Sequence, residues 1–156
     1  MIEQRSHDKI SVMPILTTYY AINGSNDDKK DGLYFYNGGP GNAIVKSIQV
    51  TVNGKVVDND YFGPFFAAIK SLNLDPFCFI YRTPRQNDFI KKEEEVAFIE
   101  ANKKSKASCA VSQSIFALKK GYQGSAEFDF KIHFKSIYNE KFTYHYRDNT
   151  QSKGWN

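Results

Sequence analysis

Residues 125–135 read Ser-Ala-Glu-Phe-Asp-Phe-Lys-Ile-His-Phe-Lys and alternate strictly between apolar and polar side chains from Ala126 onward. Successive side chains of a strand point to opposite faces of a sheet, so this period of two predicts a strand with one buried face. Phe142, Tyr144 and Tyr146 continue the alternation after the turn residues 138–140. We therefore expect an antiparallel hairpin whose even-numbered side chains face the core.

The same pattern predicts the register of the hairpin. Because the buried residues of both strands are even-numbered, opposed residues share parity and the loop has an odd length. A three-residue loop over 138–140 meets this condition and places His133 directly opposite His145. Parity alone also allows the two histidines to be diagonal neighbours. The predicted core residues of the strand are Phe128, Phe130, Ile132 and Phe134, and the predicted exposed residues are Glu127, Lys131 and Lys135.

Less regular runs predict further strands. The first has Ile10, Val12, Leu16, Thr18 and Tyr20 on one face, with Pro14 marking it as an edge strand. Others are expected over 33–36, 44–52, 55–57, 77–81 and 96–99. In the third strand Ile44, Ile48, Val50 and Val52 are expected to share a face. The dipeptide Asn53-Gly54 that follows predicts a type I′ turn. Residues 91–95 favour a polar turn leading into the last of these strands, and the alternative is a helix that starts here and runs through Asn102.

Two short helices are expected between the strands. Phe65, Ile69 and Leu72 recur at helical spacing after the N-cap candidates Asp58, Asn59 and Asp60. Val111, Ile115 and Leu118 give a second helical face after Ser108. Strands and helices do not alternate regularly, which argues against a parallel sheet. The fold class predicted is mainly β, an antiparallel β-sandwich, immunoglobulin-like or similar, with one or two short helices.

Length and charge limit the classes of protein. The 156 residues fit one domain over 1–156, with a polar lead-in at 1–9 and a flexible tail at 149–156. No run approaches the ~20 apolar residues that cross a bilayer. The 21 Lys and Arg exceed the 17 Asp and Glu by four, but the basic residues alternate with acidic ones. This pattern is typical of a solvated surface and makes nucleic-acid binding unlikely.

The two cysteines are far apart in the sequence. Cys78 lies in an apolar run, and Cys109 lies near the expected start of the second helix. Two cysteines without a CxxC motif predict neither a disulfide scaffold nor a zinc site. We expect reduced thiols and a cytoplasmic protein, since the polar start at residues 2–9 lacks the apolar core of a secretory signal.

A glycine-rich bend follows the second strand. Gly38, Gly39, Pro40 and Gly41 lack the helix and the Lys-Ser/Thr pair that a phosphate-binding loop needs. We expect a structural bend that binds no phosphate and in which at least one glycine has a positive φ. No cofactor is predicted.

Two pairs of side chains are candidates for binding. His133 and His145 should point outward from neighbouring strands, but they are weak metal candidates because zinc sites normally have three or four protein ligands. Tyr34 and Tyr36 are candidates because exposed tyrosines are frequent in binding surfaces. No residue set predicts a catalytic centre.

Three segments resemble a group of uncharacterised bacterial proteins, some of them encoded on mobile integron cassettes. Residues 9–16 (KISVMPIL), 32–47 (GLYFYNGGPGNAIVKS) and 52–55 (VNGK) are similar to the group's "SV-P-L", "GLYL-NNG-GPAIIK" and "DGK" patterns. Residues 142–148 resemble its last strand, whereas residues 39–43 depart from the usual "GxGPA" order. Many members begin with one membrane helix, so the resemblance implies that this chain is a soluble domain of an anchored protein. It implies no catalytic residues.

The expected function is a non-enzymatic binding or interaction module, because an ordered β core carries no convergent catalytic set. The alternative is a metal-dependent or hydrolytic enzyme that uses His133 and His145 or a site that the sequence does not reveal. The expected partner is another protein or a second copy of the chain, with membrane contact only through an N-terminal anchor.

Overall fold

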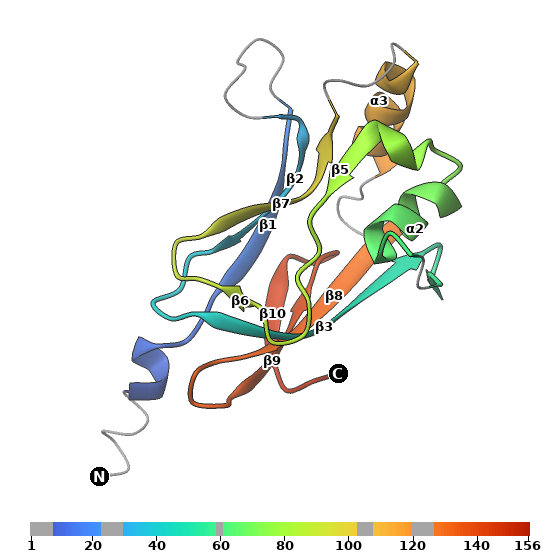
Figure 1. Cartoon of the computed structure of the whole chain (residues 1–156). Helices are drawn as coiled ribbons and strands as arrows, with labels where there is room; N and C mark the ends of the chain where they lie inside the picture. Colours follow the sequence, from blue (N-terminus) through green and yellow to red (C-terminus); the bar gives the residue numbers. More distant parts are fainter. Residues whose placement is uncertain (1–7, 23–29, 59–60, 103–107, 120–126) are drawn as a thin grey trace.

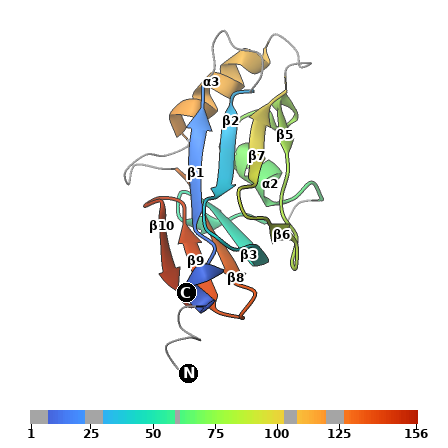
Figure 2. The same ribbon diagram turned by 90° about the vertical axis from the view of Figure 1, so that its left-hand side faces the viewer.

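Two antiparallel sheets pack against each other in a β-sandwich, as the sequence predicts (Figures 1 and 2). The structure is a computed structural model that describes residues 8–22, 30–58, 61–102, 108–119 and 127–156. The first sheet consists, in order, of β1 (Leu16–Ala21), β2 (Gly32–Asn37), β7 (Glu95–Ala101) and β5 (Phe79–Tyr81). The second consists of β10 (Thr150–Lys153), β9 (Lys141–His145), β8 (Phe128–Lys135), β3 (Ala43–Val52) and β4 (Lys55–Val56). The short strand β6 (Phe89–Ile90) pairs with the start of β3.

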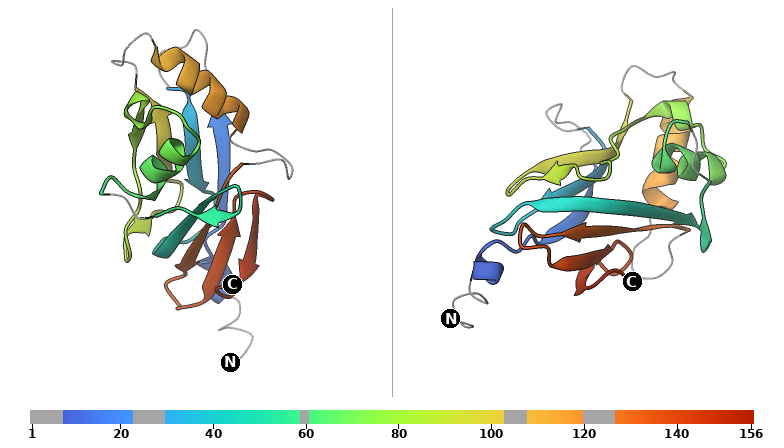
Figure 3. Two further views of the ribbon diagram at one scale, coloured as in Figure 1. Left: turned by 90° about the vertical axis from the view of Figure 1, so that its right-hand side faces the viewer. Right: turned by 60° about the horizontal axis from the view of Figure 1, so that its bottom comes forward.

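Helices cover one end of the sandwich, away from the N-terminus (Figures 1 and 3). Helix α2 (Pro64–Ser71) confirms the first predicted helix, although its N-cap is Gly63 rather than one of the predicted residues 58–60. Asn59 and Asp60, two of the three predicted caps, lie outside the described residues. Among the described residues no helix is long and apolar enough to span a membrane.

Helix α3 (Cys109–Lys119) is the second predicted helix, but its buried face differs in part from the predicted one. Cys109 and Phe116 are buried, whereas Val111 is 63% exposed and Ile115 is half-buried. The predicted face is therefore wrong at Val111, whereas Ile115 packs partly against the core, and the disulfide to Cys78 holds Cys109 in a buried position. The side chain of Leu118, the third predicted residue, lies outside the description.

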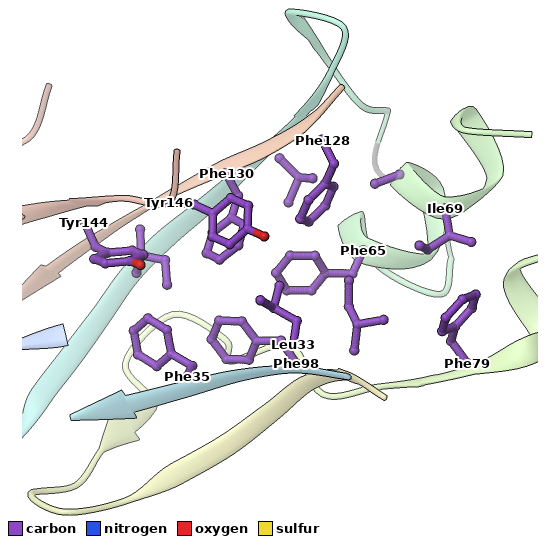
Figure 4. Close-up of a cluster of buried hydrophobic side chains, with 14 of the residues drawn as sticks. Leu33, Phe35, Phe65, Ile69, Phe79, Phe98, Phe128, Phe130, Tyr144 and Tyr146 are labelled. Carbon is purple, nitrogen blue, oxygen red and sulfur yellow. The ribbon is translucent and has the colours of Figure 1, made fainter. Parts of the chain in front are cut away.

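The core lies between the two sheets and is rich in aromatic rings (Figure 4). Phe35 and Phe98 of the first sheet stack with ring centroids 4.8 Å apart. Phe130 of β8 stacks on Tyr146, the residue after β9, with ring centroids 4.6 Å apart. Phe65 of α2 closes one end and lies 5.4 Å from both Phe98 and Phe130. The predicted burial of Phe128, Phe130, Ile132 and Phe134 is confirmed.

The hairpin of β8 and β9 has the predicted parity and a different loop length. Lys135 pairs with Lys141, so the loop has five residues, and His133 lies opposite Thr143 rather than His145. Buried Ser136 causes this difference, because its hydroxyl accepts hydrogen bonds from the main-chain amides of Tyr138 and Glu140. A side chain bonded to its own loop lengthens the loop without changing which residues face the core.

Strand β3 contains a bulge that the sequence pattern hid. The pairing with β8 shifts between Val45 and Ser47, which leaves Lys46 as an extra residue. An extra residue exchanges the two faces of a strand, so Val45 is buried before the bulge and Val50 after it, while Ile44 is only half-buried. The type I′ turn after β3 is confirmed, since Asn53 and Gly54 have φ values of 52° and 81°.

Two strands start later than predicted. Residues 8–11 form a helical turn, so the first strand begins at Leu16. The run 77–81 starts as a 3₁₀ turn, η1 (Pro76–Cys78), because the Asp75 carboxylate accepts a hydrogen bond from the amide of Phe77 at 3.0 Å. Phe77 is therefore 67% exposed instead of lying in a buried strand.

Strand β1 is an edge strand, as Pro14 predicted, and side chains tie it to the second sheet. The side chain of Gln151 accepts from the amide of Leu16 at 3.0 Å and donates to the carbonyl of Pro14 at 2.9 Å. The Tyr144 hydroxyl of β9 lies 2.7 Å from the Thr18 hydroxyl of β1. Burial of Tyr144 raises the pKa of this hydroxyl to about 12. These bonds cover an edge that would otherwise be open to pairing with another chain.

The glycine bend is held by close packing rather than by positive φ. None of Gly38, Gly39 and Gly41 has a positive φ, so that prediction was wrong. A Cβ at Gly41 would overlap the main chain of Val12, and one at Gly39 would overlap that of residues 13–15. The bend needs glycine because the segment before β1 crosses directly over it.

Buried Asn37 organises this crossing. Its amide nitrogen donates to the carbonyls of Gly41 and Ile90, each at 2.9 Å. Its side-chain oxygen accepts from the amides of Ile15 and Gly39. One side chain thus joins the segment before β1, the bend and β6.

Replacing Gly41 by alanine is expected to destabilise the protein by about 1–3 kcal/mol or more, because overpacking a rigid site forces the backbone apart. The measurement is urea unfolding followed by circular dichroism. Gly38→Ala is the matched control, since a Cβ there would meet only the ring of Tyr36, at 3.1 Å. Equal losses for both variants would contradict the close-packing explanation.

The cysteines and the end of the chain differ from expectation. Cys78 and Cys109 form a disulfide between η1 and α3, with Cα atoms 5.3 Å apart, so the prediction of reduced thiols was wrong. The cysteines therefore give no support to the predicted cytoplasmic location. Residues 149–156 are not a flexible tail, because Thr150–Lys153 form β10 beside β9.

Candidate functional site

The outer face of the second sheet gathers most of the polar side chains of β8 and β9. The even-numbered residues of β8 are buried, so its odd-numbered residues point away from the core. Gln49 pairs with Lys131, and Lys131 pairs in turn with His145. We call this surface the basic face. Its residues are Lys46, Ser47, Gln49, Thr51, Asp129, Lys131, His133, Lys135, Lys141, Thr143, His145, Arg147 and Asp148.

Positive charge predominates on the basic face. Its cationic residues are Lys46, Lys131, Lys135, Lys141 and Arg147, against the acidic residues Asp129 and Asp148 and the adjoining Asp58. Asp129 is already engaged, because it lies 3.8 Å from the guanidinium of Arg147 and accepts from the amide of Arg147 at 3.1 Å. The uncompensated lysines therefore give this face a positive potential, which steers anionic partners toward it.

Two hollows lie side by side on the basic face. One, of about 300 Å³, is lined by Gln49, Thr51, Asp129, Phe130, Lys131, His145, Arg147 and Asp148. The other, of about 420 Å³, is lined by Ser47, Ile48, Gln49, Val50, Val56, Val57, Asp58, Pro64, Lys131 and His133. Gln49 and Lys131 line both, so the two hollows form one concave surface with a histidine on each side.

Residues 154–156, which we call the strap, lie across the same face. Thr143 donates to the carbonyl of Gly154 at 2.6 Å and accepts from the amide of Asn156 at 3.2 Å. The main-chain oxygen of Asn156 lies 2.7 Å from Nζ of Lys131 and 3.0 Å from Nε2 of His133. The strap buries Thr143 and contacts Lys131. Glu127, Lys131 and Lys135 are half-buried, so the prediction that they are exposed was wrong.

Trp155, at the centre of the strap, is surrounded by cationic side chains. Its ring stacks on His133 with centroids 6.1 Å apart, and Nζ of Lys141 lies 4.6 Å from the ring centroid. Nζ of Lys46 lies 5.8 Å from the same ring, and the indole donates to the carbonyl of Phe134 at 3.0 Å. Cation–π contacts of this kind orient lysine ammonium groups over an aromatic face.

The predicted histidines occupy this face, but as diagonal rather than opposed neighbours. Nδ1 of His133 lies 3.2 Å from the Ser47 hydroxyl, and Nε2 of His145 lies 3.0 Å from the Ser152 hydroxyl. Among the described residues, the one group of three possible metal ligands is Asp75, Cys78 and Cys109, and its two sulfur atoms are bonded to each other. The histidines therefore have no third ligand beside them in the described part of the chain.

Zinc, nickel and cobalt are expected to bind weakly, because two imidazoles already engaged by hydrogen bonds make a poor site. Isothermal titration of the wild type with each ion measures this, with His133→Ala as the comparison. The variant should keep the fold and change the titration little. Tight stoichiometric binding that His133→Ala abolishes would instead support a metal site.

The predicted tyrosines lie on the other sheet, away from the basic face. Tyr34 is buried, stacks on Tyr19 with centroids 5.5 Å apart, and donates to the carbonyl of Lys30 at 2.6 Å. Tyr36 is half-buried beside Gly38. The structure therefore brings His133 and His145 to one surface and places Tyr34 and Tyr36 on β2 of the opposite sheet.

A third hollow, of about 410 Å³, lies beside β5, β6 and β7. It is lined by Arg82, Thr83, Pro84, Asp88, Phe89, Ile90, Lys91 and Val96. The guanidinium of Arg82 binds buried Glu100 at 2.7 Å, and hydrogen bonds from Arg85 lower the pKa of Asp88. Arg82 and Asp88 are thus each paired with an opposite charge, and Lys91 is the other charged residue of this hollow, so it carries less positive charge than the basic face.

The strap is the part of the site that sequence reasoning missed. Three residues are too few to show a period, and the bulge at Lys46 concealed the side of β3 that reaches Trp155. The single tryptophan of the chain was the available signal, because a large aromatic ring in a polar ending usually packs against something. Comparison with protein-family models, with curated proteins and with solved structures found no match.

Proposed function

We propose that this protein is a non-enzymatic β-sandwich module that binds an acidic segment of a partner protein on the basic face. The resemblance of residues 9–16 and 32–47 supports a bacterial origin for it. The proposal rests on one observation above all: the face already holds a short peptide segment, the strap.

The contacts of the strap are those by which a protein recognises a peptide. Thr143 binds the strap at two main-chain atoms, and Lys131 and His133 both reach the main-chain oxygen of Asn156. Main-chain hydrogen bonds of this type bind a segment whatever its side chains, and neighbouring pockets add selectivity. The two hollows provide such pockets, and no residue of the strap lines them.

Charge indicates which segment would bind. Lys131 lines both hollows, and Arg147 lines one of them. Carboxylates of a partner would pair with Lys131 and Arg147 in hollows that remain open to solvent. Complementary charge of this kind mainly accelerates association and selects the partner.

An enzyme is less well supported. The sulfur of Cys109 is bonded to Cys78 and is no nucleophile in this state. Asp129 is committed to Arg147 and to the amide of Phe130, at 2.9 Å. Asp129, a carboxylate of the hollow that contains His145, is thus engaged in structural bonds.

Calorimetric titration with a poly-L-glutamate peptide at low ionic strength tests the proposal. The double variant Lys131→Gln, Lys141→Gln should weaken binding about tenfold or more, a loss of at least ~1.4 kcal/mol. Lys91→Gln, Lys92→Gln is the matched control, because it removes the same charge from an exposed turn outside the basic face. Added salt should weaken binding to the wild type.

Three results would contradict the proposal: no binding to the wild type, an equal loss in both double variants, or a loss confined to the control. An equal loss would mean that the peptide responds to the net charge of +4 rather than to this face. Circular dichroism of both variants checks that the fold is retained.

A further inference from the structure

The strap contacts the same side chains that the proposed function assigns to a partner. Nζ of Lys131 donates to the main-chain oxygen of Asn156 at 2.7 Å, and Nε2 of His133 lies 3.0 Å from the same oxygen. Lys131 lines both hollows of the basic face, and His133 lines one of them. A carboxylate bound between these two side chains would therefore have to replace the oxygen of Asn156.

Two further lysines are oriented by the strap. Nζ of Lys141 lies 4.6 Å from the ring centroid of Trp155, and Nζ of Lys46 lies 5.8 Å from it. Together with Lys131, three of the five cationic residues of the basic face contact the strap. An ammonium group held over an aromatic face is directed toward that ring, so release of the strap makes these charges available to an acidic segment.

The strap is attached by contacts that can be exchanged with water. Gly154 and Trp155 are half-buried and Asn156 is exposed, and none of the three belongs to the hydrophobic core. The Thr143 hydroxyl donates to the carbonyl of Gly154 at 2.6 Å and accepts from the amide of Asn156 at 3.2 Å. Because water replaces such hydrogen bonds at a small net cost, the strap can leave the face without disturbing the core.

Gly154 provides the joint at which the strap begins. Its amide donates to the carbonyl of Lys141 at 2.8 Å and so continues the pairing of β10 with β9 by one residue. Its φ of 89° lies in the left-handed region, which glycine adopts without strain. The chain therefore changes from a paired strand to the strap at its conformationally freest type of residue.

We propose that the strap is a built-in competitor of the partner segment. In the free protein residues 154–156 occupy the centre of the basic face, and an acidic segment binds there by displacing them. This inference rests on the proposed function and adds its regulation. A protein whose binding-competent state is a minor fraction binds with an apparent affinity that is lowered by that fraction, so the strap sets a threshold that a segment with several carboxylates overcomes.

Thr143→Val tests this inference, because it removes both bonds of Thr143 to the strap and changes no charge and no residue that lines a hollow. Trp155 is the only tryptophan of the chain, so its fluorescence reports the strap alone. Without any peptide, the variant should shift the emission of Trp155 to longer wavelengths and raise its quenching by acrylamide. Thr150→Val is the matched control, since Thr150 is exposed in β10 and takes no part in the strap contacts described above.

Calorimetric titration with poly-L-glutamate gives the second measurement. Thr143→Val should bind the peptide about tenfold more tightly than the wild type, because losing two hydrogen bonds raises the fraction of open strap. Thr150→Val should bind like the wild type. Poly-L-glutamate contains no tryptophan, so its binding to the wild type should also shift the emission of Trp155, in parallel with the heat released.

Two results would overturn the competitor while leaving the proposed function intact: binding to the wild type that does not change the emission of Trp155, or binding to Thr143→Val that is no tighter than to the wild type. Absence of binding by both proteins would contradict the proposed function itself, and this inference with it. Circular dichroism checks the fold of Thr143→Val. If that variant does not fold, Trp155→Ala replaces it, because it removes the ring contacts with His133, Lys141 and Lys46 and should tighten binding in the same way.

Discussion

Phe130→Ala is expected to lower the free energy of unfolding by about 3–5 kcal/mol, through the lost transfer energy of the ring and the cavity it leaves. Phe130 is buried in the middle of β8, at the centre of the contact between the two sheets (Figure 4). Its ring stacks on Tyr146 at 4.6 Å and meets Phe65 of α2 edge to face at 5.4 Å. Chemical denaturation followed by fluorescence and circular dichroism measures the loss.

The control for this substitution is Phe89→Ala, which removes the same atoms from an exposed position. Its cost should stay below about 1 kcal/mol, as for most surface substitutions. Wild-type stability of Phe130→Ala would contradict the assignment of the even-numbered face of β8 to the core.

Removing the disulfide is expected to cost about 3–4 kcal/mol in the chain-entropy treatment of a closed loop of this length. Cys78 and Cys109 are separated by 31 residues, so the bond restricts a long segment of the unfolded chain. It also joins η1 to α3, where Gln113 donates to the carbonyl of Cys78 at 2.9 Å. Urea unfolding with and without dithiothreitol measures this contribution.

The double variant Cys78→Ser, Cys109→Ser separates the bond from side effects of the reductant. It should be as unstable as the reduced wild type and should not respond to dithiothreitol. A reduced wild type as stable as the oxidised protein would show that the packing of α3, with Phe116 against Phe79 at 5.5 Å, suffices without the bond.

Local patterns predicted the elements better than their boundaries. The alternation in β8 and the Asn53-Gly54 turn depend on neighbouring residues alone, and both are confirmed. Errors arose where a distant or single side chain intervenes: Ser136 lengthens one loop, and Asp75 starts η1. The glycine bend is similar, because its need for glycine comes from Val12, nearly thirty residues earlier.

The site was predicted in part for the same reason. The shared parity of the residue numbers placed His133 and His145 on one outward face, and the structure confirms this. The two histidines are diagonal neighbours, because His133 pairs with Thr143 and His145 pairs with Lys131. The strap was beyond prediction, since its contacts join residues 154–156 to three other strands. The disulfide also depends on tertiary structure, because only folding brings η1 beside α3.

The disulfide has a mechanical consequence as well. β5, β6 and β7 all lie between Cys78 and Cys109, so a force applied to the two ends of the chain passes through the sulfur atoms and bypasses these strands. Full stretching of the oxidised protein would therefore fall short by roughly 100 Å of contour length, since an extended residue spans ~3.3–3.6 Å. Two of the four strands of the first sheet lie within that covalent ring, so tension reaches β7 through its pairing with β2 and not along the chain.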